Sequence, residues 1–240
     1  AAGFPYSRNH DSGVLGVYGG PFSHDISRIF PDFDADVTDP ASYDFACTDH
    51  SILQTLEAGT KTFFRLGQTI EHQVKKHATL PPKDFHKWAV ICEHIIRHYT
   101  EGWADGFRYN IRYWEIWNEP DNHFDPKINQ MWTGTPEEYY ELYNVTAKHL
   151  KKCFPHLKIG GYSSCGFYAI AAPSPAREQS YLGFFDNFLR SVKENGAPLD
   201  FFSWHSYAGI SDTMKFAAYA REQLDRYGFT DTETTCNEWN

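Results

Sequence analysis

Tyr113-Trp114-Glu115-Ile116-Trp117-Asn118-Glu119-Pro120-Asp121 is the stretch that decides how this 240-residue chain is organised. An apolar run with strand character ends here in an Asn-Glu-Pro step. The proline stops the strand because it has no N–H to give to the hydrogen-bonding ladder. A strand that ends in polar residues suited to catalysis is typical of a parallel sheet with a site at its carboxyl edge.

The same pattern of a short apolar run followed by polar residues recurs along the chain. The candidate strands are Phe4–Asn9, Thr60–Leu66, Ile111–Trp117, Leu157–Tyr162, Phe201–His205 and Thr234–Glu238. Their nearly continuous apolar character is expected of strands that are covered on both faces. Amphipathic helices are predicted between them, over residues 49–58, after an Asp84 cap, after a Thr135 capping box, over 181–195 and over 213–227.

This alternation predicts an α/β fold with parallel strands, because each strand-to-strand crossover must pass through a helix. No glycine-rich phosphate loop follows the first strand, which disfavours a dinucleotide-binding sheet. Polar residues at several strand ends favour a TIM-type β/α barrel. Six strands are fewer than the eight of a full barrel. We therefore expect residues 1–240 to form a single catalytic domain truncated at both ends, with residues 12–48 as a long loop excursion over its mouth.

Composition narrows the classes of function. A net charge of −9 disfavours nucleic acid, whose phosphates attract clustered Lys and Arg. No apolar run reaches the length of a membrane span. The five cysteines form no close pair, which is typical of reduced thiols in a cytoplasm. Aromatic residues make up 17% of the chain, and their faces can stack on sugar rings.

Two glutamates carry the chemistry that the sequence suggests. Glu119 follows a strand beside indole rings, where low polarity is expected to keep its carboxyl protonated near neutral pH, as a general acid requires. Asn118 precedes it and is a candidate partner for a sugar hydroxyl. The segment Thr235-Cys236-Asn237-Glu238-Trp239-Asn240 delivers a second glutamate from a later strand. Glycoside hydrolysis needs two such carboxyl groups, about 5–5.5 Å apart when configuration is retained.

These ordered motifs, with Trp204-His205-Ser206-Tyr207 two strands after the first, resemble the clan A barrels of the glycoside hydrolases. Together with Arg8-Asn9-His10-Asp11 they look most like glycoside hydrolase family 39, the β-xylosidase and α-L-iduronidase family. The resemblance implies that the visible strands are the second to the seventh of the barrel. It also implies that Glu119 is the acid/base of a retaining double displacement and Glu238 its nucleophile, with no metal or organic cofactor.

The resemblance assigns supporting roles as well. Arg8 matches the position that holds the nucleophile ionised, and Tyr207 is placed to donate to Glu238 or to pack near it. The other candidate substrate-binding residues are Asn118, His10, His205 and Trp239. Glu71 and His72 are weaker candidates for substrate contact, because they depart from the family's pattern.

Several alternatives stay open at this point. The expected substrate is a xylo-oligosaccharide or a related glycoside, but α-L-iduronidase, arabinosidase, glucosidase and endo-acting specificities are not excluded. A metal-dependent hydrolase would use His10, Asp11, His72 and His205, although no zinc-binding spacing supports it. A sugar-binding fragment without turnover is the third reading. Unpaired strand edges would invite association into a homo-oligomer and would leave the 240-residue chain weakly active or inactive.

Overall fold

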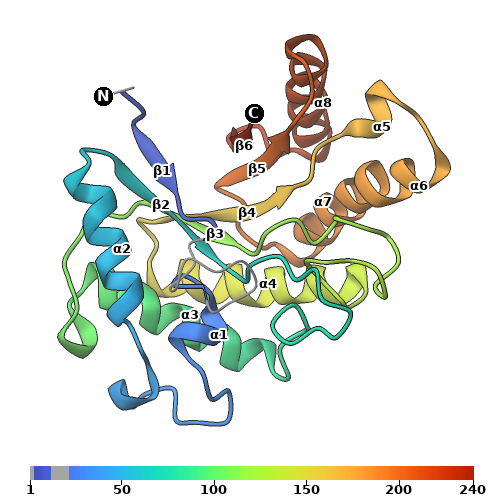
Figure 1. Cartoon of the computed structure of the whole chain (residues 1–240). Coiled ribbons are helices and arrows are strands. Elements are labelled where there is room, and N and C mark those ends of the chain that lie inside the picture. Colours follow the sequence, from blue (N-terminus) through green and yellow to red (C-terminus); the bar gives the residue numbers. More distant parts are fainter. Residues whose placement is uncertain (1–2, 12–21) are drawn as a thin grey trace.

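The computed structural model describes residues 3–11 and 22–240, which contain a single parallel sheet of six strands (Figure 1). The strands are β1 (Tyr6–Arg8), β2 (Lys61–Leu66), β3 (Tyr113–Ile116), β4 (Lys158–Ser164), β5 (Phe201–Ser206) and β6 (Glu233–Trp239). Each strand pairs in parallel with the one that follows it in sequence. This order confirms the predicted incomplete TIM-type barrel, with six strands among the described residues.

Helices form the crossovers and cover the outside of the sheet (Figure 1). The helical segments are α1 (Ile26–Ile29), η1 (Pro40–Ser42), α2 (Ala46–Glu57), α3 (Phe85–Thr100), η2 (Trp103–Asp105), α4 (Pro136–Cys153), α5 (Tyr168–Ala171), α6 (Pro175–Arg177), η3 (Glu178–Gly183), α7 (Phe184–Asn195) and α8 (Ile210–Tyr227). The predicted caps are present: Asp84 accepts from the Lys87 N–H, and Thr135 forms a capping box with Glu138. Both helices therefore begin where the sequence predicts.

Three helix boundaries differ from the predicted ones. The segment predicted as one helix over 181–195 is divided, because a π-helical turn over Glu178–Gly183 precedes α7. Helix α8 begins at Ile210 rather than 213, after Gly209, which offers no capping side chain. Helix α2 begins at Ala46 rather than 49. No helix within the described ranges combines the length and the apolar character that a membrane span requires.

The segment expected to be a long loop over the mouth has some structure of its own. Its described part, residues 22–48, holds α1, the 3-10 turn η1 and the start of α2. The Ile26 N–H donates to the Gly67 carbonyl, which places α1 just beyond the carboxyl end of β2. Residues 12–21 lie outside the described part, so the covering role of 12–48 stays a prediction.

Alternation along each strand divides the core into two layers. Phe63, Tyr113 and Phe201 point inward and pack together, with ring centroids 5.1–5.5 Å apart. The neighbouring Phe64 and Trp114 point outward and pack at 4.8 Å under the helices. By the same alternation Glu115 on β3, two residues beyond Tyr113, faces the interior nearer the carboxyl ends.

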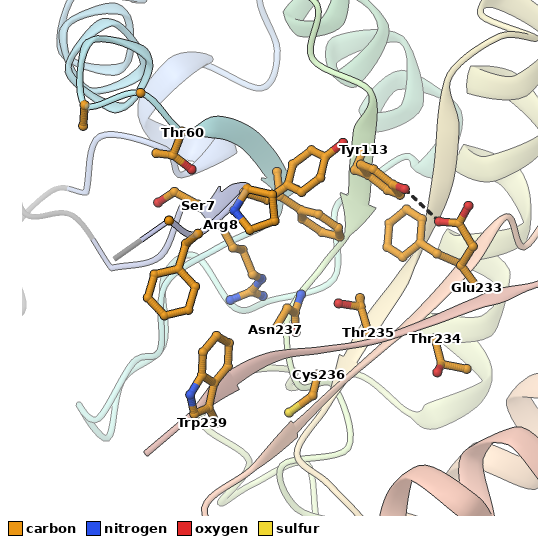
Figure 2. A pocket seen from close by; sticks show the side chains of 18 residues that line it. Ser7, Arg8, Thr60, Tyr113, Glu233, Thr234, Thr235, Cys236, Asn237 and Trp239 are labelled. Atoms are coloured by element: carbon orange, nitrogen blue, oxygen red, sulfur yellow. Dashed lines mark hydrogen bonds between the residues drawn. The ribbon is translucent and has the colours of Figure 1, made fainter. Parts of the chain in front are cut away.

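The sheet curves, so that β1 and β6 at its two ends face each other across the interior. Arg8 on β1 reaches Glu115 on β3 and Glu238 on β6. Between β1 and β6 lies a cavity of about 840 Å³, lined by the inward aromatic rings and by both end strands (Figure 2). Within the described residues β1 pairs only with β2, and β6 only with β5.

Candidate active site

The loop that follows β3 holds Glu119 in a fixed position. The Trp117 N–H donates to the Leu66 carbonyl at 2.7 Å, and the Glu119 N–H donates to the Ser163 carbonyl at 3.0 Å. Trp117 and Glu119 both have left-handed backbone conformations, with φ of 73° and 45°. These conformations turn the chain sharply before Pro120 and leave the Glu119 side chain 14% exposed.

The two candidate catalytic glutamates converge on His205. Glu119 follows β3, Glu238 lies near the end of β6, and His205 lies on β5 between them in sequence. Nδ1 of His205 lies 2.7 Å from Oε1 of Glu119, and its Nε2 lies 3.6 Å from Oε2 of Glu238. One ligand atom from each of the three residues lies within 4.8 Å of the others. The two carboxyl groups are thus nearer the separation of retaining glycosidases than that of inverting ones.

Arg8 connects the two halves of the site. Its Nη1 lies 3.4 Å from Oε2 of Glu238, and its Nη2 donates to Oδ1 of Asn118 and, at 2.9 Å, to Oγ of Ser163. Its side chain is only 5% exposed. A buried guanidinium thus lies beside the Glu238 carboxyl group and links it to Asn118 and Ser163.

Glu115 belongs to the same network, although the sequence reasoning did not single it out. It is fully buried, accepts from Nε of Arg8 at 2.6 Å, and accepts from Oγ of Ser163 and Nδ2 of Asn237 at 2.7 Å each. Burial alone would raise the pKa of Glu115, but the charge of Arg8 and hydrogen bonds from Ser203, Ser163 and Arg8 outweigh burial and lower it. A glutamate inside an apolar strand was the available signal, since such a charge needs a buried partner.

The remaining predicted site residues lie around this centre. Oη of Tyr207 donates to Oε1 of Glu238, while the Tyr207 ring is half exposed. His10 lies with Nε2 3.6 Å from Oε2 of Glu238. Asn118 is buried, and Arg8 already occupies its side-chain oxygen. Trp239 is 55% exposed at the end of β6, with its ring 6.1 Å from that of Phe4.

Glu71 has a structural role that the sequence did not suggest. Its carboxylate accepts from the backbone N–H groups of residues 77–79 and from Oγ1 of Thr79 at 2.8 Å. It therefore closes the loop of residues 71–79 on itself. These bonds occupy the carboxylate that was a weak candidate for substrate contact.

The expected protonation of Glu119 is wrong for the unliganded site. Burial would raise its pKa, as the sequence suggested, but the hydrogen bond and the charge of His205 outweigh burial and lower it. The sequence could not show this contact, because His205 is 86 residues away along the chain. Glu119 without substrate is consequently biased toward the carboxylate.

Asp121, the last residue of the opening motif, is the carboxyl group that burial keeps protonated. It is 1% exposed and accepts from Oγ of Ser164 at 2.6 Å and from the Cys165 N–H at 3.0 Å. Burial, assisted by the charge of Glu119, raises the pKa of Asp121 to about 8. Asp121 therefore joins the acid/base loop to the end of β4.

The residues of the metal-dependent alternative are not grouped as a metal site. Among residues 3–11 and 22–240, the clusters with suitable ligand spacing are Glu119–His205–Glu238 and Glu93–His149–Cys153. Of the proposed set His10, Asp11, His72 and His205, only His205 belongs to either cluster. The geometry gives that alternative no support.

The chain is similar to curated proteins and to solved structures. The chain is 27% identical to a β-xylosidase from Geobacillus stearothermophilus over 93% of its own length and 40% of that protein's. It is 28% identical to a β-xylosidase from Caldicellulosiruptor saccharolyticus over 85% of its length and 37% of that protein's. It thus spans about two fifths of the curated relatives that it matches.

A glucosidase from Croceicoccus marinus superposes on 99% of the chain, and on 50% of its own, with a TM-score of 0.76 and 29% identity. A monomeric β-xylosidase from Caulobacter crescentus covers 99% of the chain, with a TM-score of 0.67 over 46% of its own length. At 22% identity this second structure supports the fold alone. The profile of the glycosyl hydrolases family 39 matches residues 23–233, and the chain belongs to that family.

Proposed function

We propose that this chain carries the catalytic centre of a retaining glycoside hydrolase that acts on β-xylosides, with Glu238 as nucleophile and Glu119 as acid/base. The observation that carries the proposal is the convergence of the two carboxyl groups on His205, with one oxygen of each within 4.8 Å of the other. That separation leaves no room for a water between carboxylate and sugar on the nucleophile side, as an inverting reaction would need.

The reaction proceeds in two displacements. An oxygen of Glu238 attacks the anomeric carbon, the bond to the leaving oxygen breaks, and Glu119 gives that oxygen its proton. Glu119, now a carboxylate, takes a proton from water. The water oxygen then attacks the same carbon and releases Glu238, so the sugar leaves with its original configuration.

The surrounding residues have matching tasks. Arg8 and Tyr207 stabilise the negative charge of Glu238 before attack. His205 orients Glu119 through the 2.7 Å contact between its Nδ1 and Oε1 of the glutamate. The exposed face of Trp239 and the imidazole of His10 are the groups offered to the sugar.

The choice of a xyloside rests on the curated relatives, both of which are named β-xylosidases. An iduronide would need a free cation for its carboxylate, and within the described site Arg8 is already engaged by Glu115 and Asn118. A glucoside is the second candidate, because the structure with a TM-score of 0.76 is that of a glucosidase.

A panel of aryl glycosides tests the proposal, assayed on the 240-residue chain and on a version extended at both ends. Glu238→Ala is expected to abolish turnover of every substrate. Glu119→Ala is expected to cost about 10²–10⁴-fold with poor leaving groups and much less with good ones. Glu233→Ala is the matched control, since Glu233 lies at the opposite end of β6 and bonds Tyr113.

The outcomes separate the candidates. Faster turnover of xylosides than of glucosides supports the substrate assignment. The reverse order would assign the chain to a glucosidase instead. Full activity of Glu238→Ala in the extended version contradicts the mechanism. Robust activity of the 240-residue chain alone contradicts the expectation that unpaired strand edges weaken the site.

A further inference from the structure

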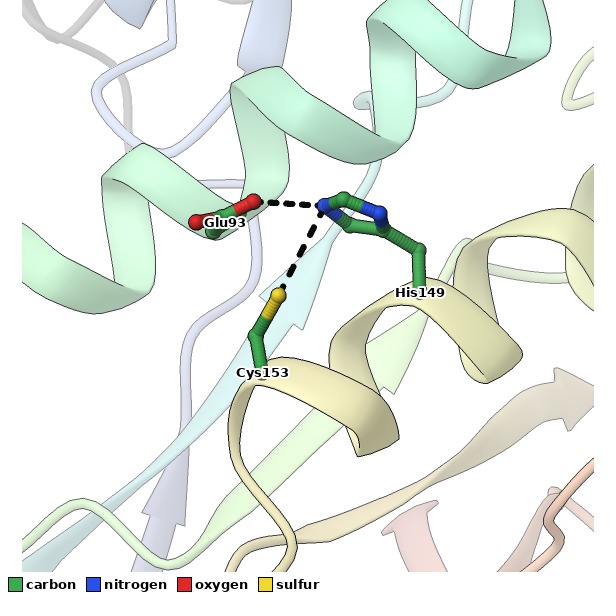
Figure 3. Close-up of side chains that lie close together, drawn as sticks. All are labelled: Glu93, His149 and Cys153. Atoms are coloured by element: carbon green, nitrogen blue, oxygen red, sulfur yellow. Dashed lines mark hydrogen bonds and ion pairs between the residues drawn. The ribbon is translucent and has the colours of Figure 1, made fainter.

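A second group of metal-binding side chains lies away from the catalytic glutamates, on the outer helices (Figure 3). Glu93 comes from α3, while His149 and Cys153 come from the last turns of α4. Strands of a β/α barrel run toward the catalytic mouth and the helices return, so the end of α4 lies toward the opposite face. Nothing in the proposed catalytic cycle uses these three residues.

The other two side chains of the cluster both lie close to Nε2 of His149. Nε2 of His149 lies 2.6 Å from Oε2 of Glu93 and 3.9 Å from Sγ of Cys153. His149 and Cys153 are four residues apart, so the helix itself presents both on one face. Figure 3 shows all three reactive ends pointing toward one another.

We propose that Glu93, His149 and Cys153 form a binding site for a divalent transition metal, with Zn²⁺ the best fit. A mixed set of carboxylate oxygen, imidazole nitrogen and thiolate sulfur suits this borderline-soft ion and not Mg²⁺ or Ca²⁺. Tetrahedral zinc would separate its N and O ligands by about 3.3 Å and its N and S ligands by about 3.6 Å. The present contacts of 2.6 and 3.9 Å need only small side-chain rotations to reach these values.

The surroundings orient one ligand of the cluster and leave it open to an ion. Arg97 donates to Oε1 of Glu93 at 2.8 Å, which orients the carboxylate and leaves Oε2 to the metal. The side chains of His149 and Glu93 are 30% and 14% exposed, so an ion has access and a water can complete the coordination. Binding releases the thiol proton of Cys153 and moves the Nε2 proton of His149 to Nδ1 or to solvent. The glutamate and thiolate charges then balance the ion.

A metal here would tie α3 to α4, and this predicts a change in stability as well as binding. Zn²⁺ binds the assembled site and not the unfolded chain, so the folded state gains stability as free zinc exceeds the dissociation constant. At a hundredfold excess over that constant, the melting temperature of a domain of this size should rise by about 5–10 °C.

The test is a titration of the chelator-treated protein with Co²⁺ and then Zn²⁺. We expect one Co²⁺ per chain, with a thiolate-to-cobalt absorption band that Zn²⁺ displaces. Cys153→Ser should remove the band, and His149→Ala should weaken binding at least tenfold. Cys47→Ser is the matched control, because this thiol on α2 belongs to neither metal-binding cluster of the described residues and should leave the band unchanged.

Glu119–His205–Glu238 is the competing site, so Glu238→Gln is titrated in parallel. The proposal requires that this variant keep the absorption band and the rise in melting temperature. It is overturned if the band survives Cys153→Ser, if Glu238→Gln abolishes binding, or if no Co²⁺ binds below millimolar concentration. Circular dichroism establishes that each variant is folded. Glu93→Gln is a further variant of the ligand set, and it must lose affinity for Co²⁺ as His149→Ala does.

Discussion

The ends of β3 and β6 each deliver an Asn-Glu step to the same site, yet they hold it in different ways. Strand β3 is paired on both sides, and the Glu119 loop after it is hydrogen-bonded to β2 and β4. Strand β6 is paired within the described residues only with β5, and Trp239 at its end is 55% exposed. The loop of Glu119, the proposed acid/base, is therefore held by backbone hydrogen bonds to two strands. The backbone of Glu238, the proposed nucleophile, is in register with β5 alone, and the side chains of Arg8 and Tyr207 contact its carboxyl group.

We expect this difference to separate substitutions that change folding stability from those that change turnover. Around β3, buried carboxyl groups such as Glu115 and Asp121 belong to the core and to the site at once. Around β6, Tyr207 and Glu238 are partly exposed and contribute less to folding. Substitutions near β3 should then change the free energy of unfolding, and those near β6 should change mainly turnover.

The largest expected effect is that of Glu115→Ala. It removes the nearer carboxylate partner of the buried Arg8 and leaves the guanidinium with only the longer 3.4 Å contact to Glu238. Such a loss costs about 3–5 kcal/mol of folding free energy. Urea unfolding measures it, and Glu233→Ala, which removes a partly exposed glutamate, is the control. A change below about 1 kcal/mol would show that the end of β3 is no more tightly held than that of β6.

Asp121→Asn tests the same region through pH. Because the pKa of Asp121 is about 8 in the folded chain and near 3.9 when unfolded, the folded state holds the extra proton between these values. Its contribution to stability is complete below pH 4 and is lost as pH rises toward 8, by up to about 1.4 kcal/mol per pH unit. Urea unfolding at pH 5, 6 and 7.5 should show that decline in the parent protein and a flatter dependence in the variant. The same pH dependence of stability in the parent protein and in Asp121→Asn would contradict the raised pKa of Asp121.

His205→Asn connects the two strand ends. It removes the hydrogen bond and charge that lower the pKa of Glu119, so that pKa should rise. Glu119, the proposed general acid, then keeps its proton to higher pH. The basic limb of the kcat/KM profile with a substrate of poor leaving group should therefore move to higher pH. An unmoved limb would mean that another group sets the protonation of Glu119.

The smallest expected change in stability is that of Tyr207→Phe. It removes one hydrogen bond to Glu238 from a ring that is half exposed, which costs about 0.5–1.5 kcal/mol at most. The rate of the glycosylation step should nevertheless fall roughly tenfold, since a change of 1.4 kcal/mol in the activation barrier is a factor of ten. Single-turnover kinetics would show it. A stability loss as large as that of Glu115→Ala would contradict the expected difference between the ends of β3 and β6.

Much of this arrangement is readable from the sequence, because strand periodicity and the proline after Glu119 are local signals. Helices α3 and α4 begin at the predicted residues for the same reason, as their caps lie within four residues. Contacts that depend on distant segments are not readable. The Glu119–His205 bond, which reverses the expected pKa shift of Glu119, is one example.

Ser163 is a second example. It bonds Arg8 and Glu115 only because its own φ of 55° turns the hydroxyl into the barrel. No pattern near residue 163 marks that conformation. The π-helical turn over Glu178–Gly183 and the uncapped start of α8 likewise give no local signal.

The left-handed backbone at Glu119 has a consequence for how this protein can change. A non-glycine residue in that conformation costs about 1–2 kcal/mol, which glycine would not incur. Laboratory selection for thermal tolerance alone would thus reward glycine at position 119 and remove the proposed acid/base together with the strain. Screens that improve this scaffold must score turnover and heat resistance in the same round.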